Sequence, residues 1–238
     1  MLSASGWAAE PLTIYTYHDK PPYFSHAVTP NQDKAGKQLY RLFIELINQQ
    51  QDSWHLELKH LPRKRLDLKL KSNQLHGAVI GVNPTWFGDK DKQRYLWSPE
   101  FMHDTDVVVV THESVIPYQQ PRDLVGKTLA LQRGFYYWGV TELVKSGDIH
   151  VLETTSDIQN VRLVMFGRVD ATIMSSLTLI SFQNADASNR KLVALPQPHD
   201  RFTRHIMFNQ HSTHAFAQLA PVIEAVSKSA DWQEQLTR

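Results

Sequence analysis

The chain of 238 residues contains no cysteine. Disulfides, thiol catalysis and cysteine-based zinc sites are therefore excluded, and the composition suits an oxidising compartment, where a stray thiol is a liability. The chain also has no large excess of charge of either sign, with 25 basic and 24 acidic residues. The net charge is +1, which gives no reason to expect nucleic acid or an anionic membrane as a partner. Long apolar runs are missing too, because no stretch reaches the roughly 18 residues that a membrane-spanning helix needs.

Sequence motifs of nucleotide binding and of nucleophilic catalysis are absent as well. The chain has no P-loop and no G-x-G-x-x-G, and the pair Ser175-Ser176 is not surrounded by G-x-S-x-G. Twelve histidines raise the question of a metal. His211 and His214 are spaced to share a helix face, but no acidic residue at ligand spacing accompanies them. We therefore expect no metal and no cofactor, and a solvated helix start at these histidines.

What the chain does contain is one pattern that occurs twice. Residues 12–81 read strand, helix, strand, helix, strand and close on the segment 77–81, and residues 127–174 repeat this order and close on 170–174. Each half is a small α/β unit. With 42% hydrophobic and 21% charged residues the chain is an ordinary globular protein. Two such units predict a two-lobed protein whose cleft binds small molecules.

Two short apolar segments are candidates for the connections between the lobes. The run 107–110 precedes the second unit and predicts a strand that crosses to lobe 2, and 192–195 predicts the return crossing. A strand at 206–208 and a helix at 215–229 follow the second unit, so we expect them to pack back on lobe 1. Two crossings form a hinge, and proteins built in this way close by hinge rotation.

The predicted fold class is therefore α/β, with two lobes that are each a small sheet flanked by helices and are joined by two hinge strands. We expect lobe 1 at 10–108 and 196–238, and lobe 2 at 109–195. Residues 1–9 do not fit the pattern, and their small residues at alternate positions resemble the end of a secretory signal peptide. These residues are either the remnant of such a peptide or an unrelated tail.

Four short motifs lie in order along the chain. They are Pro21-Pro22-Tyr23 after the first strand, R-Y-L-W-S-P-E-F at 94–101, D-L-V-G-K-T-L-A-L-Q-R-G at 123–134, and G-R-V-D-A at 167–171. Together they resemble the motifs of the extracellular solute-binding family 3, the periplasmic binding proteins of polar amino acid ABC transporters. The resemblance covers residue 11 to about residue 230 and implies a type II periplasmic binding protein fold.

The resemblance also implies two charged clamps for an amino acid, and the chain departs from both. The family's carboxylate-binding arginine lies about six residues before the F-S pair, and ungapped counting reaches Asp91 here. Arg94 is three residues closer and could substitute only if the loop differs, as the longer Trp86-Phe87-Gly88 segment suggests. The family's amine-binding acid falls at Ser175. Neither clamp is plainly in place, so the solute could differ from a standard α-amino acid.

Aromatic residues at the end of lobe 1's closing strand are candidates for ligand contact. Trp86 and Phe87 sit at the carboxyl edge of the sheet and could stack a flat or cationic ligand, or they could pack the lobe. Tyr17 ends the first strand at the same edge, as a wall residue or a core residue. Asn83 could bond a polar ligand group or satisfy its own turn.

Charged and hydroxyl side chains supply the remaining candidates. If a helix follows directly in 134–137, its free N–H groups and Arg133 both favour an anion; otherwise Arg133 is a surface residue paired with an acid. Ser175 is a neutral hydroxyl at the clamp position or an ordinary strand-end serine. The basic run 63–65 is expected on a solvated helix face. The predicted ligand-binding residues are Tyr17, Tyr23, Gly81, Asn83, Trp86, Phe87, Arg94, Gln132, Arg133, Gly134, Phe135, Tyr136 and Ser175.

The function that we expect is capture of a small polar solute, an amino acid or a related carboxylate or amine, in the cleft between the lobes. The protein would be periplasmic, monomeric and not an enzyme, and would serve an ABC importer or a sensor. An enzyme of the dehydratase type on the same scaffold is an alternative, since fold does not decide function, but nothing groups Asp91, Glu100 and Asp104. A ligand-sensing or protein-interaction module is the other alternative.

Overall fold

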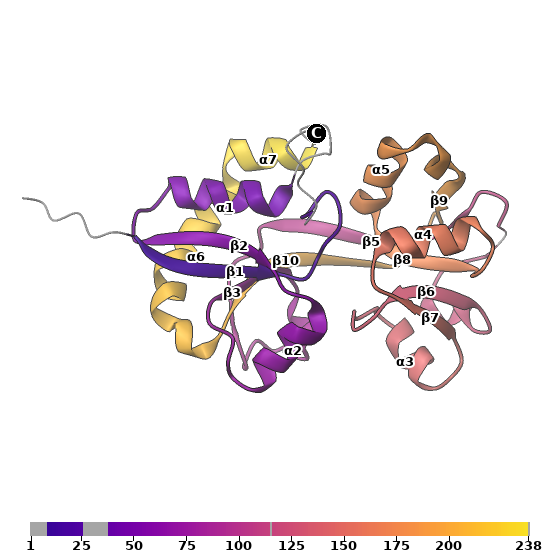
Figure 1. Cartoon of the computed structure of the whole chain (residues 1–238), viewed down its shortest axis with the longest axis horizontal. Coiled ribbons are helices and arrows are strands. Elements are labelled where there is room, and N and C mark those ends of the chain that lie inside the picture. Colours follow the sequence, from indigo (N-terminus) through magenta and orange to yellow (C-terminus); the bar gives the residue numbers. More distant parts are fainter. Residues whose placement is uncertain (1–8, 26–37, 115, 238) are drawn as a thin grey trace, which may run out of the picture. The chain divides into compact units, whose positions relative to one another are not determined.

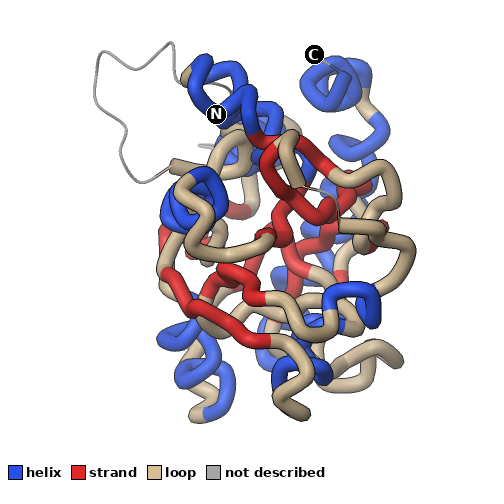
Figure 2. The backbone as a smooth tube through the Cα atoms, turned by 90° about the vertical axis from the view of Figure 1, so that its right-hand side faces the viewer, coloured by secondary structure: helices blue, strands red, loops and turns tan. Residues whose placement is uncertain are grey.

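The structure is a computed structural model that describes residues 9–25, 38–114 and 116–237. The expected signal-peptide remnant or tail therefore lies almost wholly outside the described residues. Contacts divide the chain into two compact units. Unit 1 comprises 1–18, 39–102 and 204–238, and unit 2 comprises 19–38 and 103–203. Figure 2 shows helices and strands along the whole described chain.

The first copy of the repeated pattern forms most of unit 1. Its elements are β1 (Glu10–Thr16), α1 (Leu39–Gln49), β2 (Trp54–His60), α2 (Arg63–Lys71) and β3 (Ala78–Val82). Strand β1 lies between β2 and β3 and is parallel to both. All five residues of β3 are buried, as its continuous apolar run predicts. The predicted order of strands and helices is confirmed.

Further elements complete unit 1. They are the 3₁₀ turn η1 (Pro84–Phe87), β4 (Leu96–Trp97), the second part of β10 (Asp200–Phe208), η4 (Gln210–Ser212), α6 (Thr213–Lys228) and α7 (Ala230–Thr237). Helix α7 was not predicted from the sequence. Its Trp232 is fully buried, donates from Nε1 to the carbonyl of Phe101 at 2.6 Å and packs against Phe43. Figure 1 shows α1 and α7 on one side of the unit 1 strands and α2 on the other.

The second copy of the pattern forms unit 2. Its elements are β5 (Met102–Thr111), η2 (Pro121–Leu124), β6 (Thr128–Gln132), α3 (Val140–Lys145), β7 (His150–Thr154), α4 (Asp157–Met165), β8 (Ala171–Ser175), α5 (Ser176–Ala185), η3 (Ala187–Lys191) and β9 (Leu192–Ala194). Strand β6 lies between β7 and β8 and is parallel to both. The two units thus repeat one strand arrangement, β2-β1-β3 in the first and β7-β6-β8 in the second.

Helices cover both faces of the unit 2 sheet, and the apolar residues of β5 alternate between two cores. Val108 and Val110 belong to a cluster with residues of α3, whereas Val107 and Val109 belong to a cluster with residues of α4 and α5. Figure 1 shows α3 on one side of these strands and α4 and α5 on the other. A strand buried on both faces needs such a continuous apolar run.

The predicted helix directly after β6 is wrong. Residues 134–137 are not helical, and α3 begins only at Val140. Gly134 and Gly139 have φ values of 81° and 65°, which a right-handed helix cannot contain. The segment between them is therefore not helical, and no helix follows β6 directly, because α3 begins at Val140.

The divisions between units fall at different residues from those expected. The chain leaves unit 1 between Met102 and His103 in β5 and returns between Thr203 and Arg204 in β10. The expected divisions were 108/109 and 195/196. The segment 192–195 does not return the chain, because β9 pairs with β5 inside unit 2.

Candidate functional site

The carboxyl ends of β1, β2 and β3 meet at one edge of unit 1, because the three strands are parallel. Tyr17 and His18 follow β1, Arg63 opens the helix after β2, and Trp86 and Phe87 lie on η1 after β3. These five side chains form a cluster that we call the aromatic wall. Three of its residues were predicted from the sequence, and the structure brings them together.

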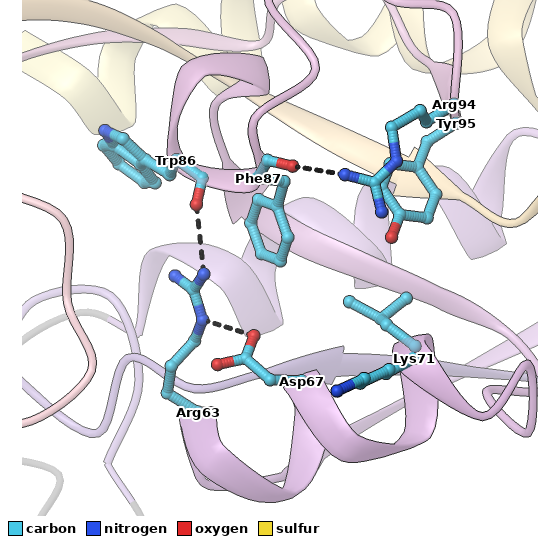
Figure 3. A pocket seen from close by; sticks show the side chains of 8 residues that line it. Arg63, Asp67, Lys71, Trp86, Phe87, Arg94 and Tyr95 are labelled. Atoms are coloured by element: carbon cyan, nitrogen blue, oxygen red, sulfur yellow. Dashed lines mark hydrogen bonds and ion pairs between the residues drawn. The ribbon is translucent and has the colours of Figure 1, made fainter.

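Arg63 is the centre of the aromatic wall. Its side chain is 10% exposed, and its guanidinium lies 4.4 Å from the ring centroid of Phe87 and 5.1 Å from that of Tyr17. It donates to the carbonyl of Trp86 at 3.0 Å and to Asp67 at 2.8 Å (Figure 3). Burial acts to lower the pKa of Arg63, but Tyr17 and Asp67 raise it above its ordinary value. The prediction of a solvated face for 63–65 is therefore wrong for Arg63.

Trp86 rests on a second buried arginine. Arg204 is 1% exposed and donates from Nη1 to the carbonyl of Gly81 at 2.7 Å. Its guanidinium lies 5.4 Å from the ring centroid of Trp86. The ring centroids of His18 and Trp86 are 6.1 Å apart, in an edge-to-face arrangement. Trp86 remains half-buried, so part of this residue is accessible to solvent.

Gly81 and Asn83 shape the backbone that carries the aromatic wall. Gly81 has a φ of 81°, and a Cβ there would lie 2.0 Å from the hydroxyl of Tyr40. Asn83 caps η1 by accepting from the backbone N–H of Thr85 at 3.0 Å. The turn-forming alternative for Asn83 is thus observed, and both residues act on the position of Trp86 through the backbone.

Arg94 lies in a cavity on another side of η1. This cavity has a volume of about 400 Å³ and is lined by Arg63, Asp67, Leu70, Lys71, Trp86, Phe87, Arg94 and Tyr95. Arg94 donates from Nη1 to the carbonyl of Phe87 at 3.3 Å and lies 5.4 Å from the ring centroid of Tyr95. Figure 3 shows the indole ring of Trp86 directed away from Tyr95 and Lys71.

In unit 2 the structure brings together two predicted residues, Tyr23 and Ser175, around a carboxylate. The Tyr23 hydroxyl donates to Oδ2 of Asp104 at 2.5 Å and lies 2.5 Å from Oγ of Ser175, which donates to Oδ1 of Asp104 at 2.9 Å. Ser175 also accepts from the N–H of Leu177 and is 0% exposed. These bonds explain the burial of all three polar side chains.

The last residue of β6 and the turn after it include five predicted residues. Arg133 pairs with Glu153 at 2.7 Å, both half-exposed, so the surface alternative is observed. Gln132 is buried, and its N–H donates to the hydroxyl of Tyr137. Phe135 lies 5.8 Å from the ammonium of Lys20. The remaining predicted residues on this turn are Gly134, with its positive φ, and Tyr136, whose pKa burial raises.

Sequence reasoning missed the arginines and the buried ion pair that position the candidates. Arg63 follows a parallel strand directly, so the rule that strand ends share one edge could have found it. Arg204 and the ion pair between Lys20 and Asp157 (3.1 Å) come from segments distant in the sequence. No local pattern marks these three residues.

The described residues contain no group of three or more histidine, aspartate or glutamate side chains that could hold a metal. His211 bonds Asn73 at 2.7 Å, whereas the ring of His214 lies 6.1 Å from that of Trp54. Within the described part of the chain no helix is both long and apolar enough to cross a membrane.

Comparison with known proteins gives the class of fold. No family model matches the chain, and no curated protein matches it. A P235GK mutant of the arginine-binding protein ArgBP from T. maritima is 20% identical, with a TM-score of 0.74 over 95% of this chain and 93% of that chain. A substrate-binding protein of an amino acid ABC transporter is 19% identical, with a TM-score of 0.73 over 95% and 97%. A histidine kinase sensor domain with similarity to periplasmic binding proteins is 16% identical, with a TM-score of 0.71 over 96% and 95%. The chain therefore has the two-lobed periplasmic binding protein fold.

Proposed function

We propose that the protein is an extracytoplasmic, non-enzymatic binding protein that captures a small polar solute. The observation that carries this proposal is the aromatic wall of unit 1, which lies at the carboxyl ends of three parallel strands and leaves Trp86 only half-buried. In open α/β sheets this edge is the usual place for ligands. The similarity in fold to amino acid binding proteins supports the same function.

The positive charges of Arg63 in the aromatic wall and of Arg204 beside it favour the carboxylate end of a solute. Arg63 already lies against the rings of Phe87 and Tyr17, and Arg204 lies against that of Trp86. A second cation at these rings would meet two positive charges, whereas a carboxylate would be attracted by them. We therefore propose a flat or zwitterionic carboxylate, with the ring of Trp86 as the stacking surface.

The predicted residues of unit 2 remain part of the proposal, with different roles. Ser175 and Tyr23 are buried and bonded to Asp104, so we propose that they hold the strand ends in place. Arg133 could contact an anion only by leaving Glu153. That exchange is feasible, because an exposed ion pair contributes only about 0–1 kcal/mol.

We propose that the protein is a monomer in the periplasm. The first recipient that we propose for the solute is an ABC importer. The similarity to a substrate-binding protein of an amino acid ABC transporter supports this destination. Reporting to a sensor is the second, and the similarity to a histidine kinase sensor domain favours it. Both destinations need the same binding step.

A thermal-shift screen tests the proposed function. The panel contains amino acids, dicarboxylates, aromatic acids, amines and small peptides. A ligand at 100 times its dissociation constant adds about 2.7 kcal/mol to the free energy of unfolding, which raises the melting temperature by several degrees. We expect a hit among the carboxylates. Hits among amines alone would contradict the charge argument, and the absence of any hit would contradict solute binding.

A further inference from the structure

Helix α2 holds an uneven share of the charge of the chain. Five of its nine residues are lysine or arginine and one is aspartate, although the net charge of the whole chain is only +1. Arg63 is directed towards η1 and is paired with Asp67 (Figure 3). The other four cations of the helix are all exposed: Lys64, Arg65, Lys69 and Lys71. The small net charge therefore conceals a local basic surface.

An exposed leucine lies among these cations. Leu68 is 67% exposed, more than any other large apolar residue that the structure describes in unit 1. Lys64 and Arg65 lie one turn before Leu68 and Lys71 lies one turn after it, at the spacings that make side chains neighbours on a helix. The opposite side of α2 carries Leu66, which is fully buried. We call the exposed side the basic face; it consists of Lys64, Arg65, Leu68, Lys69 and Lys71.

The basic face is not neutralised by its surroundings, as far as the described residues show. No described carboxylate pairs with any of its four cations. The loop 88–95 lines one cavity together with α2 and adds the exposed residues Lys90 and Lys92, with Asp91 as its one exposed acid. Cations that are clustered without counter-charges give a positive potential that attracts a surface carrying many negative charges.

We propose that the basic face binds the surface of a bilayer that contains anionic phospholipid, with Leu68 inserted at the boundary between headgroups and acyl chains. On cationic interfacial helices apolar side chains enter this boundary, while lysine and arginine keep their charged ends at the headgroups. A nucleic acid would attract the same cations but would leave the leucine without a role. The exposed leucine is therefore the observation that favours lipid over other polyanions.

The expected attachment is reversible. Each lysine or arginine near an anionic bilayer strengthens binding by about fivefold, so four of them reach on the order of 10³-fold. The net charge of the chain gave no reason to expect such a partner, and only the distribution of the charge does. Because an ABC importer is a membrane protein, attachment to the bilayer would also raise the local concentration of the protein at this recipient.

The basic face is distinct from the aromatic wall. Leu68 lies about 140° around the helix from Arg63, the centre of the wall. Of the basic face, only Lys71 also lines the cavity beside η1. Solute and bilayer therefore use different sides of α2, and we expect each to bind without displacing the other.

Cosedimentation with lipid vesicles tests this proposal. One set of vesicles contains phosphatidylcholine alone, and the other contains about one third phosphatidylglycerol. We expect binding to the anionic vesicles at about 0.1 M salt and its loss at about 1 M, because the screening length falls from about 10 Å to about 3 Å. No binding to either set, or equal binding to both, would refute the proposal.

A double variant tests the cations of the basic face. Lys64→Gln combined with Lys69→Gln should lower the partition coefficient on anionic vesicles about 30-fold. The matched control is Lys145→Gln combined with Lys228→Gln, which changes the net charge equally at exposed lysines that are already paired with glutamates. This control should bind nearly as well as the unchanged protein. Equal losses in the two double variants would refute the basic face as the contact surface.

Replacement of the leucine separates lipid from other polyanions. Leu68→Ala should lower the partition coefficient about three- to tenfold, because less apolar surface leaves water. Ile180→Ala should leave it unchanged, since Ile180 is also exposed but lies on α5, a helix without charged residues. Unchanged binding in Leu68→Ala, together with equally strong binding to a DNA duplex, would refute the lipid and indicate a general polyanion surface. None of these results decides solute binding, which the carboxylate panel tests without vesicles.

Discussion

Replacement of Arg63 by leucine should destabilise unit 1 strongly, although the residue lies in a run of three basic side chains. Arg63 donates a charge-assisted hydrogen bond to the Trp86 carbonyl, worth about 1.5–3 kcal/mol. Its contacts with the rings of Phe87 and Tyr17 add about 0.5–2 kcal/mol. Its partner Asp67 is 43% exposed and can return to water, so that pair adds little.

The expected loss in the free energy of unfolding is therefore about 2–5 kcal/mol. Urea denaturation followed by tryptophan fluorescence and by circular dichroism measures it. Lys64→Leu is the control on the same helix, where an exposed side chain should change stability by less than about 0.5 kcal/mol. Arg63→Lys should fall between the two, because an ammonium keeps the charge but not the planar fork. If Arg63→Leu and Lys64→Leu behaved alike, the central role of Arg63 in the wall would be refuted.

Three further predictions concern stability. Burial lowers the pKa of His199 to about 4, so the unfolded chain takes up the proton first as the pH falls below 6.5. The free energy of unfolding should then drop by about 3 kcal/mol between pH 7 and pH 4, and His199→Gln should lose that part of the pH dependence in urea titrations; an unchanged pH profile would contradict it. Gly81→Ala should cost about 2–4 kcal/mol, because a Cβ would strike Tyr40, whereas Gly126→Ala, with a similar φ and no atom within 4 Å, should cost only about 1 kcal/mol in the same assay. Equal costs for the two glycine variants would argue against the Tyr40 contact. Ser175→Ala should cost about 1–3 kcal/mol in urea denaturation by leaving Asp104 short of a donor, and a loss below about 0.5 kcal/mol would show that the network is unimportant.

The repeated strand and helix order could be predicted because it rests on local periodicity. The buried strand β3 reads as a continuous apolar run, and Ser156 caps α4 as its side chain predicts. Packing over long sequence distances could not be predicted in the same way. Helix α7 depends on one tryptophan, Trp232, which packs against Phe43 and Phe101, and no local pattern marks these contacts.

The candidate site shows the same division. The aromatic residues after β3 could be predicted because strand ends share an edge of the sheet. The burial of Arg63 could not, since a basic run on a helix normally faces water and only the tertiary contacts with Tyr17, Trp86 and Phe87 show otherwise. Arg133 was predicted on the assumption of a helix start, which two glycines of positive φ prevent.

Titration of the solute found in the panel into Trp86→Ala tests the central claim most directly. Trp54→Ala is the matched control, because Trp54 is also half-buried in unit 1 but opens β2 at the opposite edge of the sheet, where it pairs with Glu10. We expect Trp86→Ala to weaken binding by about 1–3 kcal/mol, the scale of a stacked aromatic anchor, and Trp54→Ala to leave it unchanged. Unchanged affinity in Trp86→Ala, or equal losses in both variants, would contradict the assignment of the aromatic wall as the solute-binding surface.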